Sequence, residues 1–201
     1  MNRREALKKL GLTFGLVAAG PGFMAACASA EKPADGRYFF TDEQFDLLSS
    51  TVDVIIPKTT KYPSASEVGV PEYIDRYVGE VVSLEEQDKI KAYMDVLSKK
   101  SASTAVDELV KGALDLEPAD QGKMWNQINS YTESVNSGTS GSLSDEAAIF
   151  ALMYNLRSMT IGAYKNSRKV GEEILVYESV PGHQKGCVDL QETTGGLAWS
   201  L

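Results

Sequence analysis

The sequence predicts a mainly α-helical protein: an irregular helical bundle followed by an extended C-terminal tail. Apolar residues recur at helical spacing through most of residues 39–169, and several of these stretches follow a Ser or Thr that suits a helix N-cap. Strands do not alternate with helices in the way that a parallel sheet requires. After Lys169 the spacing gives way to short apolar runs broken by Pro and Gly, which predicts the tail.

The first helix is predicted to begin after Thr41. Thr41 and Gln44 form a capping-box pattern, in which each side chain bonds the backbone N–H of the other residue. The apolar residues that follow keep helical spacing; they are Phe45, Leu48, Val52, Ile55 and Ile56. Pro57 ends this run, and residues 58–69 are predicted to form a turn-rich loop.

Two further helices are predicted after the loop. Pro71 suits the first residue of the second helix, and Ser83 with Glu86 gives another capping-box pattern for the third. The inward face of the second helix is predicted to carry Ile74, Tyr77, Val78 and Val81. The inward face of the third is predicted to carry Ile90, Tyr93, Met94 and Leu97.

A weaker fourth segment and a fifth helix come next. The fourth carries Ala105, Leu109 and Leu114, and Gly112 disfavours it because glycine costs about 1 kcal/mol inside a helix. Pro118 opens the fifth helix, whose apolar residues are Met124, Trp125, Ile128 and Tyr131. A flexible loop is predicted over residues 136–142.

The longest predicted helix runs from about Asp145 to Lys165, with Ser144 as its N-cap. It is apolar on nearly every side, so we expect it to lie at the centre of a bundle or to be covered by a partner. Beyond it, Ile174, Val176 and Tyr177 form a short extended stretch, and the chain continues as an irregular segment to Trp199.

The first 26 residues resemble an export signal. Arg3 and Arg4 lie in a basic segment, residues 10–19 are apolar, and small residues precede Cys27. The adjacent arginines favour the twin-arginine route, which carries folded cargo, over ordinary secretion. A membrane span is disfavoured, because the apolar run is much shorter than the ~20 residues that cross a bilayer.

Cys27 is the predicted site of lipidation. Met24-Ala25-Ala26-Cys27 resembles a bacterial lipobox, although cleavage near Ala28-Ser29-Ala30 is an alternative. We therefore expect an export signal at 1–26, an anchor and tether at 27–38, and a single helical domain at 39–201. Removing residues 1–26 takes away four basic residues and one acidic residue, which changes the formal net charge from −8 to −11.

This acidity argues against binding to nucleic acid or electrostatic attachment to anionic lipid. The two cysteines exclude a disulfide-dense scaffold, and a single histidine disfavours a structural zinc site. No phosphate-binding glycine loop or other catalytic motif is found, so no catalytic, cofactor-binding or metal-binding residue is assigned. Tyr62, Tyr73, Tyr77 and Tyr93 are interpreted as core rather than as a stacking surface, from their helical spacing.

Two residues of the tail keep alternative interpretations. As an odd cysteine in an exported chain, Cys187 is predicted either to form an inter-subunit disulfide or to be a buried, inert thiol. His183 lies in a Pro/Gly-rich loop without a nucleophile motif, which favours a surface or interface role over that of a catalytic base.

Residues 39–78 resemble the N-terminal signature of the gluconate 2-dehydrogenase subunit 3 family. The resemblance rests on Ile55-Ile56-Pro57 at the end of one helix and on residues 69–75 (GVPEYID) at the start of the next. The 160–164 segment (TIGAY) and Pro181-Gly182…Gly186-Cys187 resemble the family's closing motif. Residues 162–166 (GAYKN) depart from the family's usual Gly-Tyr/Trp-Phe-Thr-Ser, so no residue role is carried over there.

The resemblance implies a non-catalytic subunit of a dehydrogenase complex. Its partner would be a large FAD-dependent subunit of the glucose-methanol-choline type, which acts on sugars or sugar acids, and a cytochrome c subunit with haem c commonly completes the complex. The large subunit has no export signal of its own and crosses the membrane with the small one. The complex would then be lipid-anchored on the periplasmic side of a bacterial membrane.

The predicted partner surface combines the long helix with residues 171–199, which would wrap along the large subunit. Its residues are Phe150, Tyr154, Met159, Tyr164, Tyr177, His183 and Trp199. Two other functions stay open from the residues alone: a stand-alone periplasmic lipoprotein that binds a small ligand in its bundle, and a hydrolase that uses His183.

Overall fold

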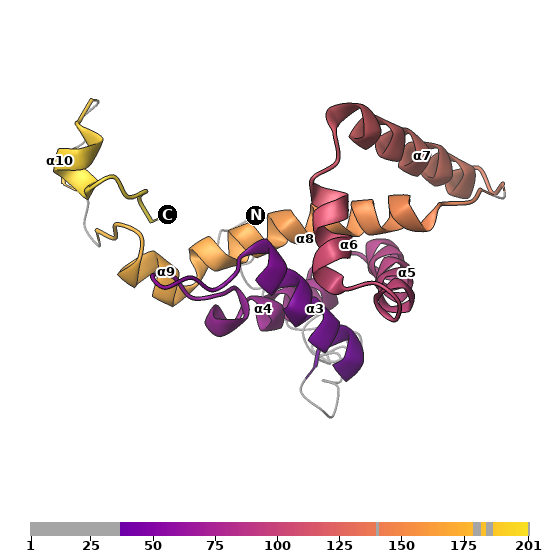
Figure 1. Cartoon of the computed structure of the whole chain (residues 1–201), viewed down its shortest axis with the longest axis horizontal. Coiled ribbons are helices and arrows are strands. Elements are labelled where there is room, and N and C mark those ends of the chain that lie inside the picture. Colours follow the sequence, from indigo (N-terminus) through magenta and orange to yellow (C-terminus); the bar gives the residue numbers. More distant parts are fainter. Residues whose placement is uncertain (1–36, 140, 179–181, 184–186, 201) are drawn as a thin grey trace, which may run out of the picture. The chain divides into compact units, whose positions relative to one another are not determined.

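The computed structural model describes residues 37–139, 141–178, 182–183 and 187–200, and these residues form a mainly helical domain (Figure 1). Its elements, in chain order, are α3 (Asp42–Ile55), η1 (Ser66–Val68), α4 (Val70–Glu80), α5 (Leu84–Ser101), α6 (Val106–Leu114), α7 (Pro118–Asn136), α8 (Asp145–Asn166), α9 (Arg168–Glu173) and α10 (Leu190–Thr194). Arg3, Arg4 and Cys27 lie outside the described residues. Within these ranges, no helix combines the length and the apolar composition needed to span a bilayer.

Side-chain caps start three of the helices where the sequence predicts them. At α3 the capping box is complete: the Gln44 N–H donates to Thr41 Oγ1, and the Thr41 N–H donates to Gln44 Oε1, both at 3.3 Å. Ser144 accepts the Ala147 N–H at 3.2 Å and starts α8. Ser83 accepts the Glu86 N–H, while the Glu86 carboxylate pairs with Lys89. These local bonds satisfy N–H groups that the helix itself leaves unpaired.

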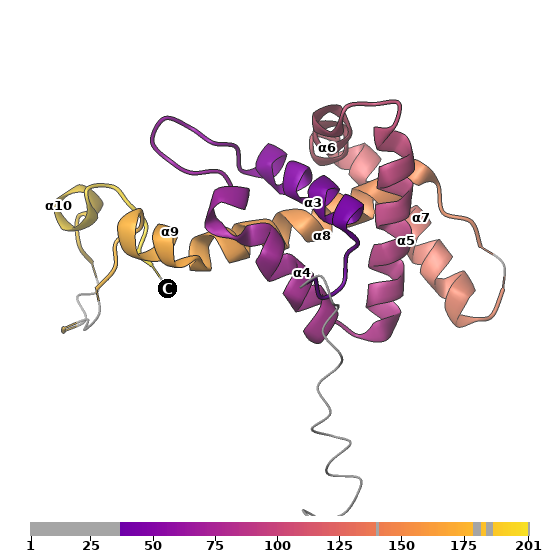
Figure 2. The same cartoon turned by 90° about the horizontal axis from the view of Figure 1, so that it is seen from below.

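The central element is α8, as the sequence predicts. It contacts α3, α4, α5, α6, α7 and α9, and Figures 1 and 2 both show it running through the group formed by α3 to α6. All seven residues from Ala147 to Met153 are buried, which explains why its first half has no polar face. Its second half is amphipathic, with buried Leu156, Thr160 and Ala163 and exposed Tyr154 and Ile161.

Helix α7 covers one side of α8 through half-buried residues, and none of its residues is fully buried. The Trp125 ring lies edge-on to Phe150 and Tyr154 of α8, with ring centroids 5.3 Å and 5.0 Å apart. Phe150 is therefore in the interior, and its large apolar surface stabilises the contact between α7 and α8.

The face of α4 that meets the core differs from the prediction. Val70, Pro71, Ile74, Asp75 and Val78 are buried. Tyr73, Tyr77 and Val81, by contrast, are 52%, 37% and 65% exposed, so the assignment of these tyrosines and of Val81 to the core is wrong. Residues 70, 71, 74 and 78 form the side of α4 that packs on α3 and α8. Tyr73 and Tyr77 lie on another side of the helix and therefore point outward.

The C-terminal region contains more helix than predicted. Two short helices, α9 and α10, lie in the region expected to be extended. Val176, between these helices, pairs with Trp199, which follows α10, in an isolated parallel bridge. The Val176 N–H donates to Ala198 O at 3.0 Å, and the Ser200 N–H donates to Val176 O at 2.8 Å. The end of the chain thus returns to the residues that follow α9.

Candidate functional site

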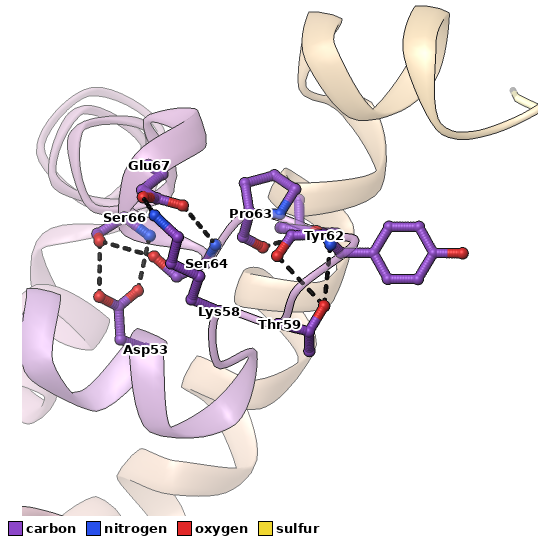
Figure 3. A network of polar contacts seen from close by, with 9 residues as sticks. Asp53, Lys58, Thr59, Tyr62, Pro63, Ser64, Ser66 and Glu67 are labelled. Carbon is purple, nitrogen blue, oxygen red and sulfur yellow. Dashed lines mark hydrogen bonds and ion pairs between the residues drawn. The ribbon is translucent and has the colours of Figure 1, made fainter.

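The loop between α3 and α4 is held by a network of polar contacts (Figure 3). Asp53, on α3, accepts the Ser66 N–H at 2.8 Å and the Ser66 hydroxyl at 2.6 Å. Thr59 Oγ1 accepts the Tyr62 N–H at 2.9 Å, and the Thr59 N–H donates to Tyr62 O at the same distance. Gly69, with φ of 79°, ends η1 in the left-handed region that glycine tolerates best, and α4 starts there.

Glu67 is the charged centre of this network. Its carboxylate forms an ion pair with Lys58 and accepts the Ser64 N–H at 3.1 Å. The hydrogen bond from Lys58, followed by that from the Ser64 backbone, holds the pKa of Glu67 below its ordinary value. Glu67 therefore stays ionised at neutral pH and fixes both ends of the loop.

A second network joins the start of the domain to α4. The Asp75 carboxylate is 2% exposed and accepts the backbone N–H groups of Tyr38, Phe39 and Phe40 at 2.8, 3.0 and 2.9 Å. A buried carboxylate is stable only when donors compensate its lost hydration, and these three N–H groups supply them. The 69–75 motif does not predict this role of Asp75, because the donors lie 35 or more residues earlier in the chain.

Exposed apolar side chains are frequent in two stretches of the described chain, one at α4 and the start of α5 and one after α9. The first, which we call the α4 strip, consists of Tyr73, Tyr77, Val81 and Leu84, and the rings of Tyr73 and Tyr77 stack with centroids 6.0 Å apart. The second, which we call the C-terminal patch, consists of Tyr177, Val188, Leu190, Leu197 and Trp199. Clusters of exposed apolar side chains mark surfaces that bind other molecules.

The structure separates the residues predicted to form the partner surface. Tyr154, Tyr177, His183 and Trp199 are exposed, Met159 and Tyr164 are half-buried against the core, and Phe150 is buried. The Val176–Trp199 bridge places the chain segments that carry Tyr177 and Trp199 side by side. The α4 strip was missed, because its spacing is equally compatible with a core-facing stripe.

Cys187 is exposed and free, so the interpretation as a buried thiol is wrong. The inter-subunit disulfide stays a prediction. His183 is exposed in the segment between α9 and α10. Among the residues that the structure describes, no group of three or more His, Cys, Asp or Glu side chains is arranged to hold a metal ion.

The described residues define an all-α module built around one central helix and rimmed by exposed apolar side chains. This chain belongs to the gluconate 2-dehydrogenase subunit 3 family, whose sequence profile matches residues 42–182. The match runs from the first residue of α3 to the segment after α9, so it includes Pro181-Gly182 and stops before Gly186-Cys187. No curated protein and no solved structure matches the chain. The family is that of an accessory subunit of a dehydrogenase complex, which implies a catalytic partner.

Proposed function

We propose that this chain is the non-catalytic small subunit of a periplasmic FAD-dependent dehydrogenase of the glucose-methanol-choline type that oxidises a sugar or sugar acid. The observation that carries the proposal is the family match along α3 to α9. In this role the chain needs no cofactor of its own, since the large subunit binds FAD and a cytochrome c subunit carries haem. The chain supplies export, stability and membrane attachment.

The α4 strip and the C-terminal patch are the surfaces on which we expect the large subunit to bind. Both present exposed tyrosine or tryptophan side chains, and these residue types are enriched at the centres of protein interfaces. Burying apolar surface stabilises a complex by about 25 cal/mol per Å² before the costs of association are subtracted. Partner binding at these surfaces would therefore stabilise both chains.

A co-purification experiment tests the partner surfaces. The affinity-tagged small subunit is purified from its native host, and flavin absorbance in the eluate is measured. We expect Tyr73→Ser/Tyr77→Ser and Tyr177→Ser/Trp199→Ser to lower the yield of flavoprotein at least tenfold. Val135→Ser is the control, because Val135 is 51% exposed on α7 and belongs to neither surface. A wild-type chain that elutes without flavin would refute the proposed role.

The proposed roles in export and membrane attachment depend on the N-terminal residues 1–27. Arg3-Arg4 would direct the folded, flavin-loaded complex through the twin-arginine route, and lipidated Cys27 would hold it at the membrane. We expect Arg3→Lys/Arg4→Lys to leave both subunits in the cytoplasm and Cys27→Ser to release an active complex into the periplasm. Dehydrogenase activity that stays periplasmic with the paired lysines would contradict the twin-arginine route.

One observation favours the alternative of a ligand-binding lipoprotein. An apolar cavity of about 380 Å³ lies among α6, α7 and α8, lined by side chains that include Leu109, Leu116, Met124 and Ile149. Ligand pockets of proteins have volumes of about 300–1,000 Å³ and are mostly apolar. A rise in melting temperature with an apolar ligand, abolished by Ala113→Phe and found without any partner subunit, would support this second function.

A further inference from the structure

Helix α7 is weakly attached to the rest of the domain. It is 19 residues long, yet none of its residues is fully buried. Every other described helix of eight or more residues has at least two buried residues. Its main neighbour is α8, and Figures 1 and 2 both show it at the edge of the helical group. A segment with few buried contacts opens at a lower free energy than the core, so α7 is expected to open before the other long helices.

The attachment of α7 to α8 depends on the middle of α7. The Trp125 ring lies edge-on to the rings of Phe150 and Tyr154, as described above. The Ser144 hydroxyl at the start of α8 donates to Gln127 Oε1 at 2.7 Å. Gln127 is exposed, so water competes for this hydrogen bond and its net contribution is small. Trp125 is therefore the main anchor of α7.

The packing between α7 and its neighbours is incomplete. The apolar cavity of about 380 Å³ is lined by Met124 of α7, Leu109 of α6 and Ile149 of α8. Side chains that border a cavity lack the dispersion contacts that a filled interface would give them. Moving α7 away from α6 and α8 therefore breaks fewer contacts than moving a helix out of a filled core would.

Hydrogen bonds at the two ends of α7 join the helix to its own flanking residues. At its start, Gln121 Nε2 donates to Leu116 O at 2.7 Å. At its end, the Thr139 N–H donates to Ser134 O at 2.8 Å, and Gly138 takes a φ of 70°, in the left-handed region. These bonds do not involve α8, so they can persist while α7 moves away from it. The helix and its capped ends can therefore move as one unit.

The side of α8 beneath α7 is apolar. Phe150 is 4% exposed and Ala147 is 0% exposed. Ala147 precedes Phe150 by three residues and Tyr154 by seven, so the three share one side of the helix. We propose that α7 is a hinged cover, which swings away from α8 as a unit while the other helices stay folded, and so opens and closes this apolar side. The inference does not rest on the proposed function, because the surfaces used there lie at α4 and after α9.

Thiol labelling of the full chain without a partner subunit measures the opening. Cys27 and Cys187 are replaced by serine, and one cysteine is introduced by Ala147→Cys beneath α7 or by Ala65→Cys in the core; both alanines are 0% exposed. Each labelling rate is divided by the rate of the same variant unfolded in urea. We expect the thiol at position 147 to react about a hundredfold faster than the thiol at position 65, because opening α7 exposes only the first. Equal rates would mean that both thiols react only after global unfolding, and would overturn the proposal.

Removal of the anchor gives a second test. Trp125→Ala, added to each cysteine variant, should speed labelling at position 147 about tenfold and leave labelling at position 65 unchanged. The control Val135→Ala truncates an apolar side chain that is 51% exposed on the same helix, and it should change neither rate. Equal acceleration at both positions, or a Trp125→Ala chain that does not fold, would show that α7 belongs to the cooperative core and would overturn the proposal.

Discussion

The Tyr164 hydroxyl on α8 donates a hydrogen bond to the backbone carbonyl of Pro63, 101 residues earlier in the chain, at 3.0 Å. Burial raises the pKa of Tyr164 above its ordinary value, so the phenol stays protonated and can donate at neutral pH. This bond connects the central helix to the loop between α3 and α4, and it joins the core to the polar network of that loop.

Removing this hydroxyl should loosen the loop. Tyr164→Phe leaves the ring packing in place and deprives the Pro63 carbonyl of its donor, so we expect a loss of about 1 kcal/mol in the free energy of unfolding. Urea denaturation monitored by circular dichroism measures the change. Tyr154→Phe, on the exposed side of α8, is the control and should change stability by less than about 0.5 kcal/mol. Equal effects of the two substitutions would contradict the assigned role of the bond.

The Asp75 carboxylate should be far more sensitive to substitution. Asp75→Asn keeps the size of the side chain but turns an NH₂ group toward N–H donors, and it removes the charge from three charge-assisted bonds. We expect a loss of about 2–3 kcal/mol in the free energy of unfolding. Chemical denaturation of this variant, beside the exposed control Asp88→Asn, gives the measurement. A loss no larger than that of the control would mean that other acceptors replace Asp75.

Acid should remove the contribution of Glu67. Its pKa is lowered in the folded chain, so its contribution to stability is present above the unfolded value, near 4.5, and is lost as the pH falls through the folded pKa. The difference in melting temperature between the wild type and Glu67→Gln should therefore stay constant from pH 7 to about pH 5 and shrink at lower pH. Thermal melts across this range provide the test. A difference that grows on acidification would show the opposite sign of linkage.

Two glycines in helices should respond in opposite ways to the same substitution. A Cβ at Gly79 in α4 would lie 2.9 Å from Tyr38 O and 3.0 Å from Tyr38 Cβ, so we expect Gly79→Ala to destabilise the fold by about 1–3 kcal/mol. A Cβ at Gly112 in α6 meets nothing within 4 Å, and Gly112→Ala should stabilise it by about 0.5–1 kcal/mol. Thermal or chemical denaturation of both variants decides the matter. Stabilisation by both would show that helix propensity outweighs the contact with Tyr38, and destabilisation by both would contradict the expected gain at Gly112.

Several parts of the fold could be predicted because their causes are local. The starts of α3 and α8 depend on Thr41, Gln44 and Ser144, each within three residues of the N–H group that it caps. The central place of α8 follows from its composition, since a helix without a polar face must be covered on all sides. The candidate networks could not be predicted in this way. Asp53 and Ser66, and Asp75 and Phe40, meet only after the chain has folded.

The sequence by itself determined the helical class, most helix starts and the family. The reason is that capping bonds, apolar spacing and the family signature each depend on residues close together in the chain. The tertiary structure decided which side of each helix meets the core. Helix α4 packs on α3 and α8 through the side that carries Ile74 and Val78, which leaves Tyr73 and Tyr77 exposed. The Trp125 ring covers Phe150 on α8, which removes Phe150 from the surface. Which side of a helix is buried depends on all its contacts with helices far apart in the sequence, and these contacts form only in the folded chain.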